Sequence, residues 1–451
     1  MALFGTDGIR GLANRELTAE LALNVAIATA HILVANKGAQ SKRPHAIVGQ
    51  DSRASGEFLE AAVVAGLTSA GIDVYRVGIL PTPAIAHLVA ESEADLGVMI
   101  SASHNAMPDN GIKIFARGGE KLDDKIEAAI EARVSELKSG AIWERPTGTE
   151  VGRAISDESA TERYLKHLLA SVKTSLKGLK IVVDCANGAS SFVAPEALRR
   201  AGAEVVAIYN APDGWNINDG CGSTHLDKLR VAVTKEGADF GIAHDGDADR
   251  CLAIDGKGND VDGDVIMTIL ALGFKARGAL TSNTIVGTVM SNLGFMKAMK
   301  DADIKVISTA VGDRYVLEEM LKNNFSLGGE QSGHLIMREF ANTGDGILTA
   351  LALAQEVAKS GKSLNELASA MQRFPQILIN VKDVAKEKLD GSKVIKEAIS
   401  AAELSLGDKG RVLLRASGTE PLVRVMVEAQ SDSLAKEIAM NLAKVVEQEL
   451  R

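Results

Sequence analysis

Three aspartates separated by small residues form the part of the sequence that most clearly suggests chemistry. Asp245, Asp247 and Asp249 alternate with Gly246 and Ala248 between two apolar runs. Alternate side chains of an extended segment point to one face, so we expect the carboxylates to share a face and the small residues to allow close packing on the other. Carboxylates this close repel one another unless a cation lies among them, and oxygen ligands suit Mg²⁺, Mn²⁺ or Ca²⁺. The segment therefore predicts a divalent-cation site.

Two other interpretations of this segment are a solvated acidic turn and a calcium loop of the EF-hand type. The flanking apolar runs disfavour the solvated turn. The EF-hand is excluded because its sixth position needs Gly and its twelfth Glu, whereas counting from Asp245 gives Arg250 and Gly256. We therefore expect the cation to serve a reaction.

A serine-rich loop is the first candidate for a nucleophile. Ser101, Ser103 and His104 follow an apolar run that reads as a strand, and Lys113 lies a few residues further on. Alternation places Ser101 and Ser103 on one face, so periodicity does not choose between them. Serines in such loops are also common turn and cap residues, which makes this motif weak by itself.

Two further loops could bind a sugar phosphate. Glu330 and Ser332 lie in a glycine-bounded loop that ends at His334, and they could accept from and donate to sugar hydroxyls. The segment Arg415 to Pro421, with Arg424 beyond, combines guanidinium groups, hydroxyls and a glycine. That combination is typical of an oxyanion site, although a surface ion-pair network is the alternative.

A glycine-rich segment near the N-terminus, Gly5 to Gly11, holds Arg10 and is also suited to an anion. The remaining polar residues of this segment give it no further specificity. Taken singly it is therefore a weak signal.

The elements that must position these loops repeat three times. Each block alternates strands with a helix, which predicts α/β architecture with mainly parallel sheets. The expected strands are Ala46 to Gly49, Ile72 to Val77 and Leu96 to Ile100 in the first block, Lys180 to Asp184, Glu204 to Tyr209 and Phe240 to Ala243 in the second, and Thr284 to Gly287, Lys305 to Ser308 and Phe325 to Leu327 in the third. The expected helices are Glu57 to Ala70, Ala194 to Ala201 and Leu293 to Lys300.

The serine, aspartate and glutamate loops each follow the last strand of their block. Open α/β sheets bind ligands at the carboxyl ends of their strands, so the three loops are expected to face one cleft. After Pro375 the pattern changes to strand, helix, two strands and helix, which predicts a smaller α+β module.

Composition limits the functions open to the chain. Its 451 residues are 46% hydrophobic and carry a net charge of −9, so we expect a water-soluble protein of about three domains and no nucleic-acid partner. Cys185, Cys221 and Cys251 form no metal-binding spacing and are expected to be reduced thiols. No secretion signal or membrane span is expected, which predicts a cytoplasmic protein.

Together these loops closely resemble the alpha-D-phosphohexomutases, and the resemblance spans essentially the whole chain. The matching segments are Phe4 to Gly11, Ser101 to Asn105, Asp109 to Lys113, Asn218 to His225, Asp245 to Arg250, Val311 to Tyr315, Gly329 to His334 and Arg415 to Pro421. The resemblance implies a heart-shaped protein of three similar α/β domains and a smaller α+β domain around a central cleft.

Domain boundaries follow from the repeat and the resemblance. We expect an α/β domain with the phosphoserine loop at 1–155, one with the metal-binding loop at 156–258, and one with the sugar-binding loop at 259–372. The α+β domain with the phosphate-binding loop is expected at 373–451.

The reaction that the resemblance implies interconverts glucosamine 6-phosphate and glucosamine 1-phosphate, on the route to UDP-N-acetylglucosamine. Phosphorylated Ser103, the residue directly before the histidine, exchanges its phosphoryl group with the sugar through glucosamine 1,6-bisphosphate. A phosphoserine beside three carboxylates needs compensating positive charge, which Mg²⁺ would supply.

The roles of individual residues also come from the resemblance. The metal ligands are Ser103, Asp245, Asp247 and Asp249, and the stabilisers of the transferring phosphoryl group are Arg10, Lys113 and Arg250. Glu330 and Ser332 hold sugar hydroxyls, and Arg415, Ser417, Gly418, Thr419 and Arg424 hold the phosphate that is not reacting. His334, Lys113 and His104 all remain candidates for the general base.

Three other functions compete with this interpretation. A mutase of glucose or mannose phosphates would keep the mechanism, although Gln331 and the Gly5 to Gly8 segment favour the amino sugar. An aspartyl-phosphate phosphatase would use Asp245 as nucleophile, and a non-catalytic phosphosugar-binding protein would not need Ser103. Ala106 stands where much of the family has Pro, which could loosen the nucleophile loop. A homodimer is a further prediction.

Overall fold

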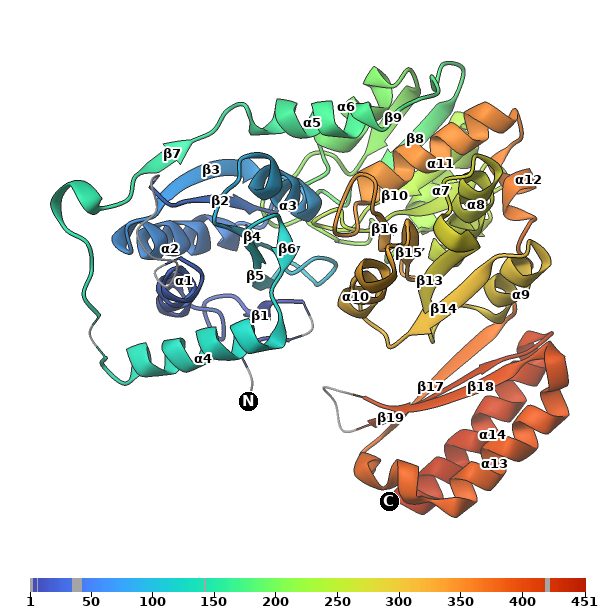
Figure 1. Ribbon diagram of the computed structural model, residues 1–451. Coiled ribbons are helices and arrows are strands. Elements are labelled where there is room, and N and C mark those ends of the chain that lie inside the picture. The colour runs from blue at the N-terminus through green and yellow to red at the C-terminus, as the bar shows by residue number, and fades with distance from the viewer. Residues whose placement is uncertain (1–2, 6, 35–42, 142, 418–421) are drawn as a thin grey trace. The chain divides into compact units, whose positions relative to one another are not determined.

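The computed structural model describes residues 3–5, 7–34, 43–141, 143–417 and 422–451 (Figure 1). Contacts divide the chain into two compact units. The first unit is Met1–Met290 with Lys305–Ser369, and the second is Ser291–Ile304 with Ala370–Arg451. No helix among the described residues is both long and apolar enough to cross a membrane. The four expected domain ranges stay a prediction.

The first sheet follows the order β1-β5-β4-β2-β3-β7, with β6 paired to β5. Its strands are β1 (Ile9–Leu12), β2 (His45–Gln50), β3 (Asp73–Ile79), β4 (Leu96–Ile100), β5 (Asp109–Ala116), β6 (Glu120–Lys121) and β7 (Ala154–Ser156). Helices α1 (Ala19–Leu33), α2 (Ser55–Ser69) and α4 (Asp124–Lys138) share a core cluster with one face of this sheet. Helix α3 (Thr82–Glu91) packs against β2 and β4.

The second and third sheets belong to the same unit and follow the orders β12-β11-β10-β8-β9 and β14-β13-β15-β16. Their strands are β8 (Lys180–Asp184), β9 (Glu204–Ile208), β10 (Phe240–Ala243), β11 (Leu252–Asp255), β12 (Asp260–Val261), β13 (Thr284–Thr288), β14 (Lys305–Thr309), β15 (Leu327–Gly329) and β16 (Leu335–Met337). Their helices are α5 (Ala160–Ala170), α6 (Val193–Arg200), α7 (Asp227–Glu236), α8 (Gly263–Ala276), α10 (Asp313–Asn323), α11 (Gly346–Ser360) and α12 (Leu364–Ala368).

The predicted threefold repeat is confirmed by the pairing of the strands. In each of the three sheets a central strand has two parallel neighbours: β2 lies between β3 and β4, β8 between β9 and β10, and β13 between β14 and β15. The strands β4, β10 and β15 each pair antiparallel with the next strand of the chain on their other side. The serine, aspartate and glutamate loops therefore leave topologically equivalent strands.

The predicted elements differ from the structure in several bounds and in their number, and the antiparallel strands β5, β11 and β16 were not predicted. The third strand of the third block begins at Leu327 rather than Phe325. Each block also contains a second helix that the periodicity did not predict, namely α3, α7 or α10. Helix α3 is buried along most of its length, so it lacks the polar face that would reveal a helical period.

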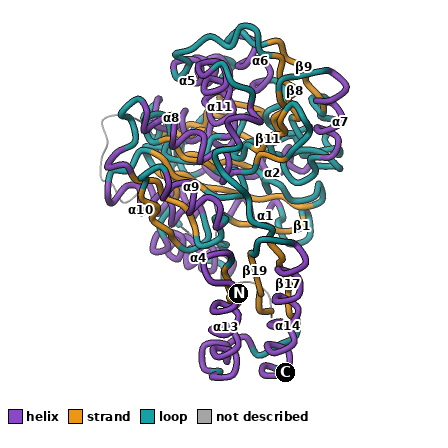
Figure 2. The backbone as a smooth tube through the Cα atoms, turned by 90° about the vertical axis from the view of Figure 1, so that its right-hand side faces the viewer, coloured by secondary structure: helices purple, strands orange, loops and turns teal. Residues whose placement is uncertain are grey.

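The second unit contains the antiparallel sheet β17-β19-β18, which confirms the predicted smaller module. Its strands are β17 (Gln376–Lys382), β18 (Arg411–Ala416) and β19 (Leu422–Glu428), and its helices are α9 (Leu293–Asp301), α13 (Lys393–Leu406) and α14 (Asp432–Leu450). Figures 1 and 2 both show α13 and α14 beside these strands. The core of this unit joins the inward side chains of the sheet to α14.

A buried carboxylate connects α9 to this sheet. Glu428 is fully buried and accepts the backbone N–H of Leu293 at 2.8 Å and the side-chain amide of Asn292 at 3.2 Å. The guanidinium of Arg411 donates to the same carboxylate at 2.7 and 3.1 Å. Glu428 therefore binds the N-terminus of α9, which is far from it in the sequence. A negative charge is favourable at this end of a helix.

We expect Glu428→Ala to destabilise the second unit by about 2 kcal/mol, because the N–H of Leu293 and the partly exposed guanidinium of Arg411 lose their buried acceptor. The loss should appear as faster hydrogen exchange at the start of α9 and as a lower urea midpoint for the second unit. Glu437→Ala, at an exposed position of α14, is the control and should change stability by less than about 0.5 kcal/mol. Unchanged exchange at Leu293 in Glu428→Ala would contradict this role.

Candidate active site

The serine loop after β4 gives its two hydroxyls different roles. Ser101 donates its hydroxyl to Asp51 at 2.6 Å and accepts the backbone N–H of Ser103 at 2.9 Å. Ser103 instead donates its Oγ to Asp245 Oδ2 at 2.5 Å and lies 3.3 Å from His104 Nδ1. Of the two serines, Ser103 is therefore the one that contacts the aspartate cluster.

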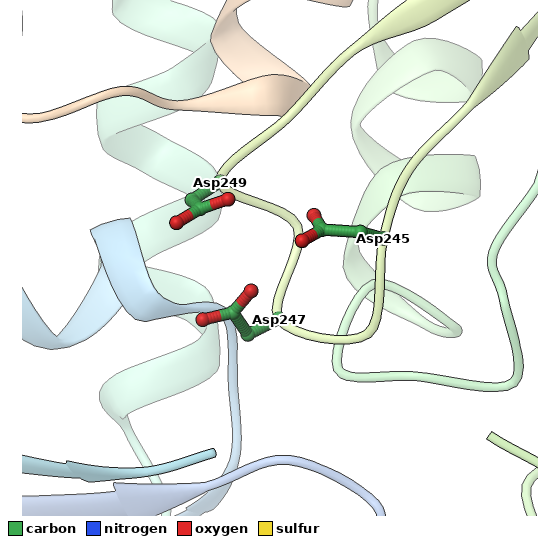
Figure 3. Close-up of side chains that lie close together, drawn as sticks. All are labelled: Asp245, Asp247 and Asp249. Atoms are coloured by element: carbon green, nitrogen blue, oxygen red, sulfur yellow. The ribbon is translucent and has the colours of Figure 1, made fainter. Parts of the chain in front are cut away.

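The aspartate cluster lies in the loop between β10 and β11. Asp245, Asp247 and Asp249 are all buried, and one carboxylate oxygen of each lies within 4.8 Å of the others. Figure 3 shows their carboxylates converging on one space. The predicted extended conformation is wrong: Ala248 donates its N–H to Asp245 O at 3.1 Å and has a φ of 55°. A tight turn, rather than strand alternation, brings the carboxylates together.

The predicted close packing behind this loop is confirmed. A Cβ on Gly246 would lie 2.6 Å from Ser103 O, and a Cβ on Gly188 would lie 2.3 Å from Gly246 O. Only glycine allows backbone to approach backbone this closely. Because Gly246 has no side chain, the aspartate loop can lie directly against the backbone of Ser103.

Electrostatics inside the cluster favour a bound cation. Burial, followed by the charges of Asp249 and Asp247, raises the pKa of Asp245 to about 8. Oδ1 of Asp247 and Oδ1 of Asp249 are buried and accept no hydrogen bond from any residue that the structure describes. Carboxylate oxygens without donors are costly to bury. The chemistry of these oxygens therefore fits a hard divalent cation.

Lys113 is the nearest cation of the protein to this cluster. Its Nζ lies 2.8 Å from Asp247 Oδ2, 2.7 Å from Asp7 Oδ2 and 3.5 Å from Asp249 Oδ2. Burial alone would lower the pKa of Lys113, but these three carboxylates raise it well above the usual value. A lysine that holds its proton this firmly is better suited to stabilising negative charge than to acting as a general base.

The two predicted arginines lie at the serine loop and at the aspartate cluster. Arg10 donates to Asn105 Oδ1 at 3.3 Å and to Asp7 Oδ2 at 2.8 Å. Arg250 follows the aspartates directly, with Nε 3.9 Å from Asp249 Oδ1. Their positive charges, after the larger effect of burial, lower the pKa of His104 to about 4. His104 is therefore neutral near pH 7 and can accept a proton.

The loop after β15 contributes His334 to the same region. Its Nδ1 lies 3.6 Å from Asp249 Oδ2, and its Nε2 lies 3.3 Å from Asp313 Oδ2. Burial would lower the pKa of His334, but Asp313 and Asp249 raise it. Glu330, from the same loop, accepts the N–H of Gly312 at 3.0 Å, and Ser332 is half-buried.

The structure adds residues that the sequence analysis did not select. Lys121 donates to Asp7 Oδ1 at 2.6 Å and also to Asp313, so a chain of alternating charges connects Lys113 with His334. Asp7 and Asp313 lie inside the segments Phe4 to Gly11 and Val311 to Tyr315, which the sequence analysis had selected. Their carboxyl groups could therefore have been chosen as candidate site residues from the sequence. Lys121 carries no such signal, because a lysine in a β-hairpin is usually a solvated residue.

Thr82, Asp51 and Arg53 were also missed. Thr82, at the start of α3, donates its hydroxyl to Asp247 and its N–H to Asp247 O at 3.0 Å. Arg53 and Asp51 form a fully buried pair behind the serine loop. Nothing in the sequence marks these residues, because they contact the site only through the tertiary structure.

The predicted phosphate-binding residues lie in the second unit. Arg415 on β18 and Arg424 on β19 are directly opposite each other, and burial followed by the charge of Arg424 lowers the pKa of Arg415. Like charges at opposed positions of a sheet are destabilising, so an anion between them would be favourable. Ser417 is buried, with its carbonyl accepting from Lys386 at 2.6 Å. Gly418 and Thr419 lie outside the described residues.

Comparison with known proteins is consistent with this geometry over the whole chain. The four domain profiles described as phosphoglucomutase/phosphomannomutase match in order: domain I at residues 1–141, domain II at 162–258, domain III at 262–374 and the C-terminal domain at 378–445.

A curated relative from Streptomyces coelicolor, named phosphoglucosamine mutase, is 58% identical over 448 residues, which cover 99% of both chains. A second, from Thermobifida fusca, has the same name and is 59% identical over 99% of this chain and 98% of its own. A solved phosphoglucomutase/phosphomannomutase family protein from Burkholderia thailandensis has the same fold, with a TM-score of 0.83 at 22% identity over 99% of this chain and 97% of its own. The chain therefore belongs to the phosphoglucomutase/phosphomannomutase family.

Proposed function

We propose that the chain is a phosphoglucosamine mutase, an isomerase that interconverts glucosamine 6-phosphate and glucosamine 1-phosphate on the route to UDP-N-acetylglucosamine. The observation that carries the proposal is the buried hydrogen bond from Ser103 Oγ to Asp245, inside a cluster of three carboxylates. The shared name of relatives at 58% identity supports the amino sugar as substrate.

The cation in this proposal is Mg²⁺, held by Asp245, Asp247, Asp249 and an oxygen on Ser103. Its fit rests on the two buried oxygens of Asp247 and Asp249 that accept no hydrogen bond from the described residues. When bound, Mg²⁺ would neutralise charge on the phosphoryl group of Ser103 and on the carboxylates around it. Thr82 and Lys113 would hold Asp247 in position by their bonds to its Oδ2.

The reaction moves one phosphoryl group between Ser103 and the sugar. A sugar hydroxyl attacks the phosphorus, the bond from phosphorus to Ser103 Oγ breaks, and glucosamine 1,6-bisphosphate forms. After this intermediate turns around, Ser103 Oγ attacks the other phosphate and the sugar hydroxyl leaves. Lys113, Arg10 and Arg250 would stabilise the charge of the transferring group. Arg10 contacts Asn105 of the serine loop, and Lys113 and Arg250 lie beside Asp247 and Asp249.

Proton transfer requires an acceptor for the hydroxyl proton of the attacking sugar. His104, with a pKa lowered to about 4, would accept it without being protonated beforehand. His334 lies between Asp249 and Asp313, which would stabilise its charged form after it accepts a proton. Both remain candidates for the base, whereas the firmly held proton of Lys113 argues against that role.

Substrate binding would involve two further sets of residues. Glu330 and Ser332 would bind the sugar hydroxyls, and Arg415, Ser417 and Arg424, with Gly418 and Thr419, would bind the phosphate that is not reacting. The opposed guanidinium groups of Arg415 and Arg424 support an anion at that place. A cytoplasmic location and a homodimer remain predictions.

The test of the proposed function is a comparison of three sugars. With a hexose 1,6-bisphosphate as primer, kcat/KM for glucosamine 6-phosphate should exceed the values for glucose 6-phosphate and mannose 6-phosphate by at least about 100-fold, equivalent to about 3 kcal/mol of transition-state binding. Coupled assays of 1-phosphate formation provide the measurement. A higher kcat/KM for mannose 6-phosphate or glucose 6-phosphate would show that the chain is a mutase for that sugar instead.

Removal of one carboxylate should separate metal binding from folding. We expect Asp247→Asn to weaken Mn²⁺ binding, measured by electron paramagnetic resonance, by about 100-fold and to reduce kcat at least as much. Asp260→Asn, at an exposed position of β12, is the matched control and should bind Mn²⁺ like the original protein. Unaltered Mn²⁺ affinity in Asp247→Asn would rule out the proposed site.

A further inference from the structure

The backbone of Ser103 has an unusual conformation for a residue with a side chain. Its φ is 52°, in the left-handed region, which is unfavourable for an L-residue other than glycine. This conformation turns the chain sharply after β4 and directs the hydroxyl to Asp245. Such a conformation persists only where the surrounding groups enforce it.

The carbonyl groups of the serine loop converge on one buried guanidinium. Arg53 NH2 donates to Ser103 O at 3.0 Å and to Asn105 O at 2.9 Å. Its NH1 donates to Ala106 O at 2.6 Å and to Asp109 O at 3.0 Å. The side chain of Arg53 is fully buried, so these bonds do not compete with water. One side chain thus fixes four carbonyls of the loop.

The N–H side of Ser103 is connected to the same arginine. Arg53 Nε donates to Asp51 Oδ2 at 2.9 Å, and that carboxylate also accepts the hydroxyl of Ser101. Ser101 Oγ in turn accepts the N–H of Ser103. Both peptide groups of Ser103 are therefore held by the Asp51–Arg53 pair, one directly and one through Ser101.

A second contact closes the loop from the other side. Asn218, in the second block, donates its amide to Ser103 O at 2.8 Å and to Asn105 O at 3.0 Å. Gly246 leaves no space behind that carbonyl. The carbonyl oxygen of Ser103 therefore accepts hydrogen bonds from Arg53 of the first block and Asn218 of the second. Together these bonds fix the orientation of the peptide group.

We propose that Arg53 is a positioning residue for phosphoryl transfer, which with Asp51 imposes the left-handed conformation of Ser103 and so fixes Oγ at the aspartate cluster. This inference rests on the proposed function. Arg53 acts by geometry rather than by charge, because Asp51 neutralises it at 2.9 Å. Lysine cannot replace it, since an ammonium group lacks the planar fork that reaches four carbonyls at once.

Ala106 also takes part in this set of bonds. Its carbonyl oxygen accepts from both Arg53 and the N–H of Asp109. The loosening expected from Ala106 in place of proline stays a prediction.

The test compares Arg53→Lys, Asp51→Asn and the double variant with the original enzyme. We expect each single change to lower kcat about 100-fold, because the nucleophile is misplaced by about 1 Å, and to leave KM for glucosamine 6-phosphate within about threefold. Because the two residues act as one unit, the double variant should lose no more than about threefold beyond either single variant. Mn²⁺ affinity should fall much less than kcat does, since three of the four proposed ligands, the aspartates, lie on another loop.

Two further measurements separate positioning from a general loss of structure. Single-turnover transfer of phosphate from Ser103 to sugar should slow as much as kcat does in Arg53→Lys. Arg163→Lys, which alters an arginine bound to Glu91 and Asp157, is the control and should keep kcat. The inference is overturned if Arg53→Lys keeps kcat within about threefold, or if kcat and Mn²⁺ affinity fall together with cooperative unfolding. If the original protein isomerises no hexose phosphate, the proposed function is wrong. If the original protein is active and Arg53→Lys is about as active, only the positioning role of Arg53 is wrong.

Discussion

The site depends on the burial of three carboxylates against a serine hydroxyl. Without compensating charge, Asp245, Asp247 and Asp249 would repel one another strongly in a medium of low dielectric constant. Lys113 compensates part of this charge, and burial, together with the neighbouring carboxylates, raises the pKa of Asp245 to about 8. A divalent cation would complete the compensation, and a phosphate on Ser103 would share it. Repulsion among the carboxylates is thus what favours a cation in this cluster.

The fold supplies this arrangement by repetition. Strands β4, β10 and β15 occupy the same place in three sheets. The loops that follow them therefore have equivalent positions but can present different functional side chains. Ser103 comes from the first, the aspartates from the second and His334 from the third. Close backbone contact between Gly246 and Ser103 joins the first two loops, and the charge chain from Lys113 to His334 joins the first to the third.

The sequence was sufficient to predict the three strand-end loops and the small C-terminal module, because polar residues after apolar runs and the change of pattern at Pro375 are local signals. It was not sufficient to predict the turn of the aspartate loop, since the same spacing fits an extended strand and the left-handed Ala248 has no signal of its own. Arg53 and Thr82 were missed for a different reason: each contacts a loop far away in the sequence, Thr82 across 165 residues. Such partners are determined only by tertiary packing.

The central claim is that Ser103, and not an aspartate, carries the phosphoryl group beside the metal. It is tested most directly by peptide mapping of the protein after acid quenching during turnover of glucosamine 6-phosphate whose phosphoryl group is radiolabelled. The account predicts an acid-stable label on Ser103, absent together with turnover from Ser103→Ala, while that variant still binds the sugar phosphate. An acid-labile label on Asp245, or full turnover by Ser103→Ala, would contradict it.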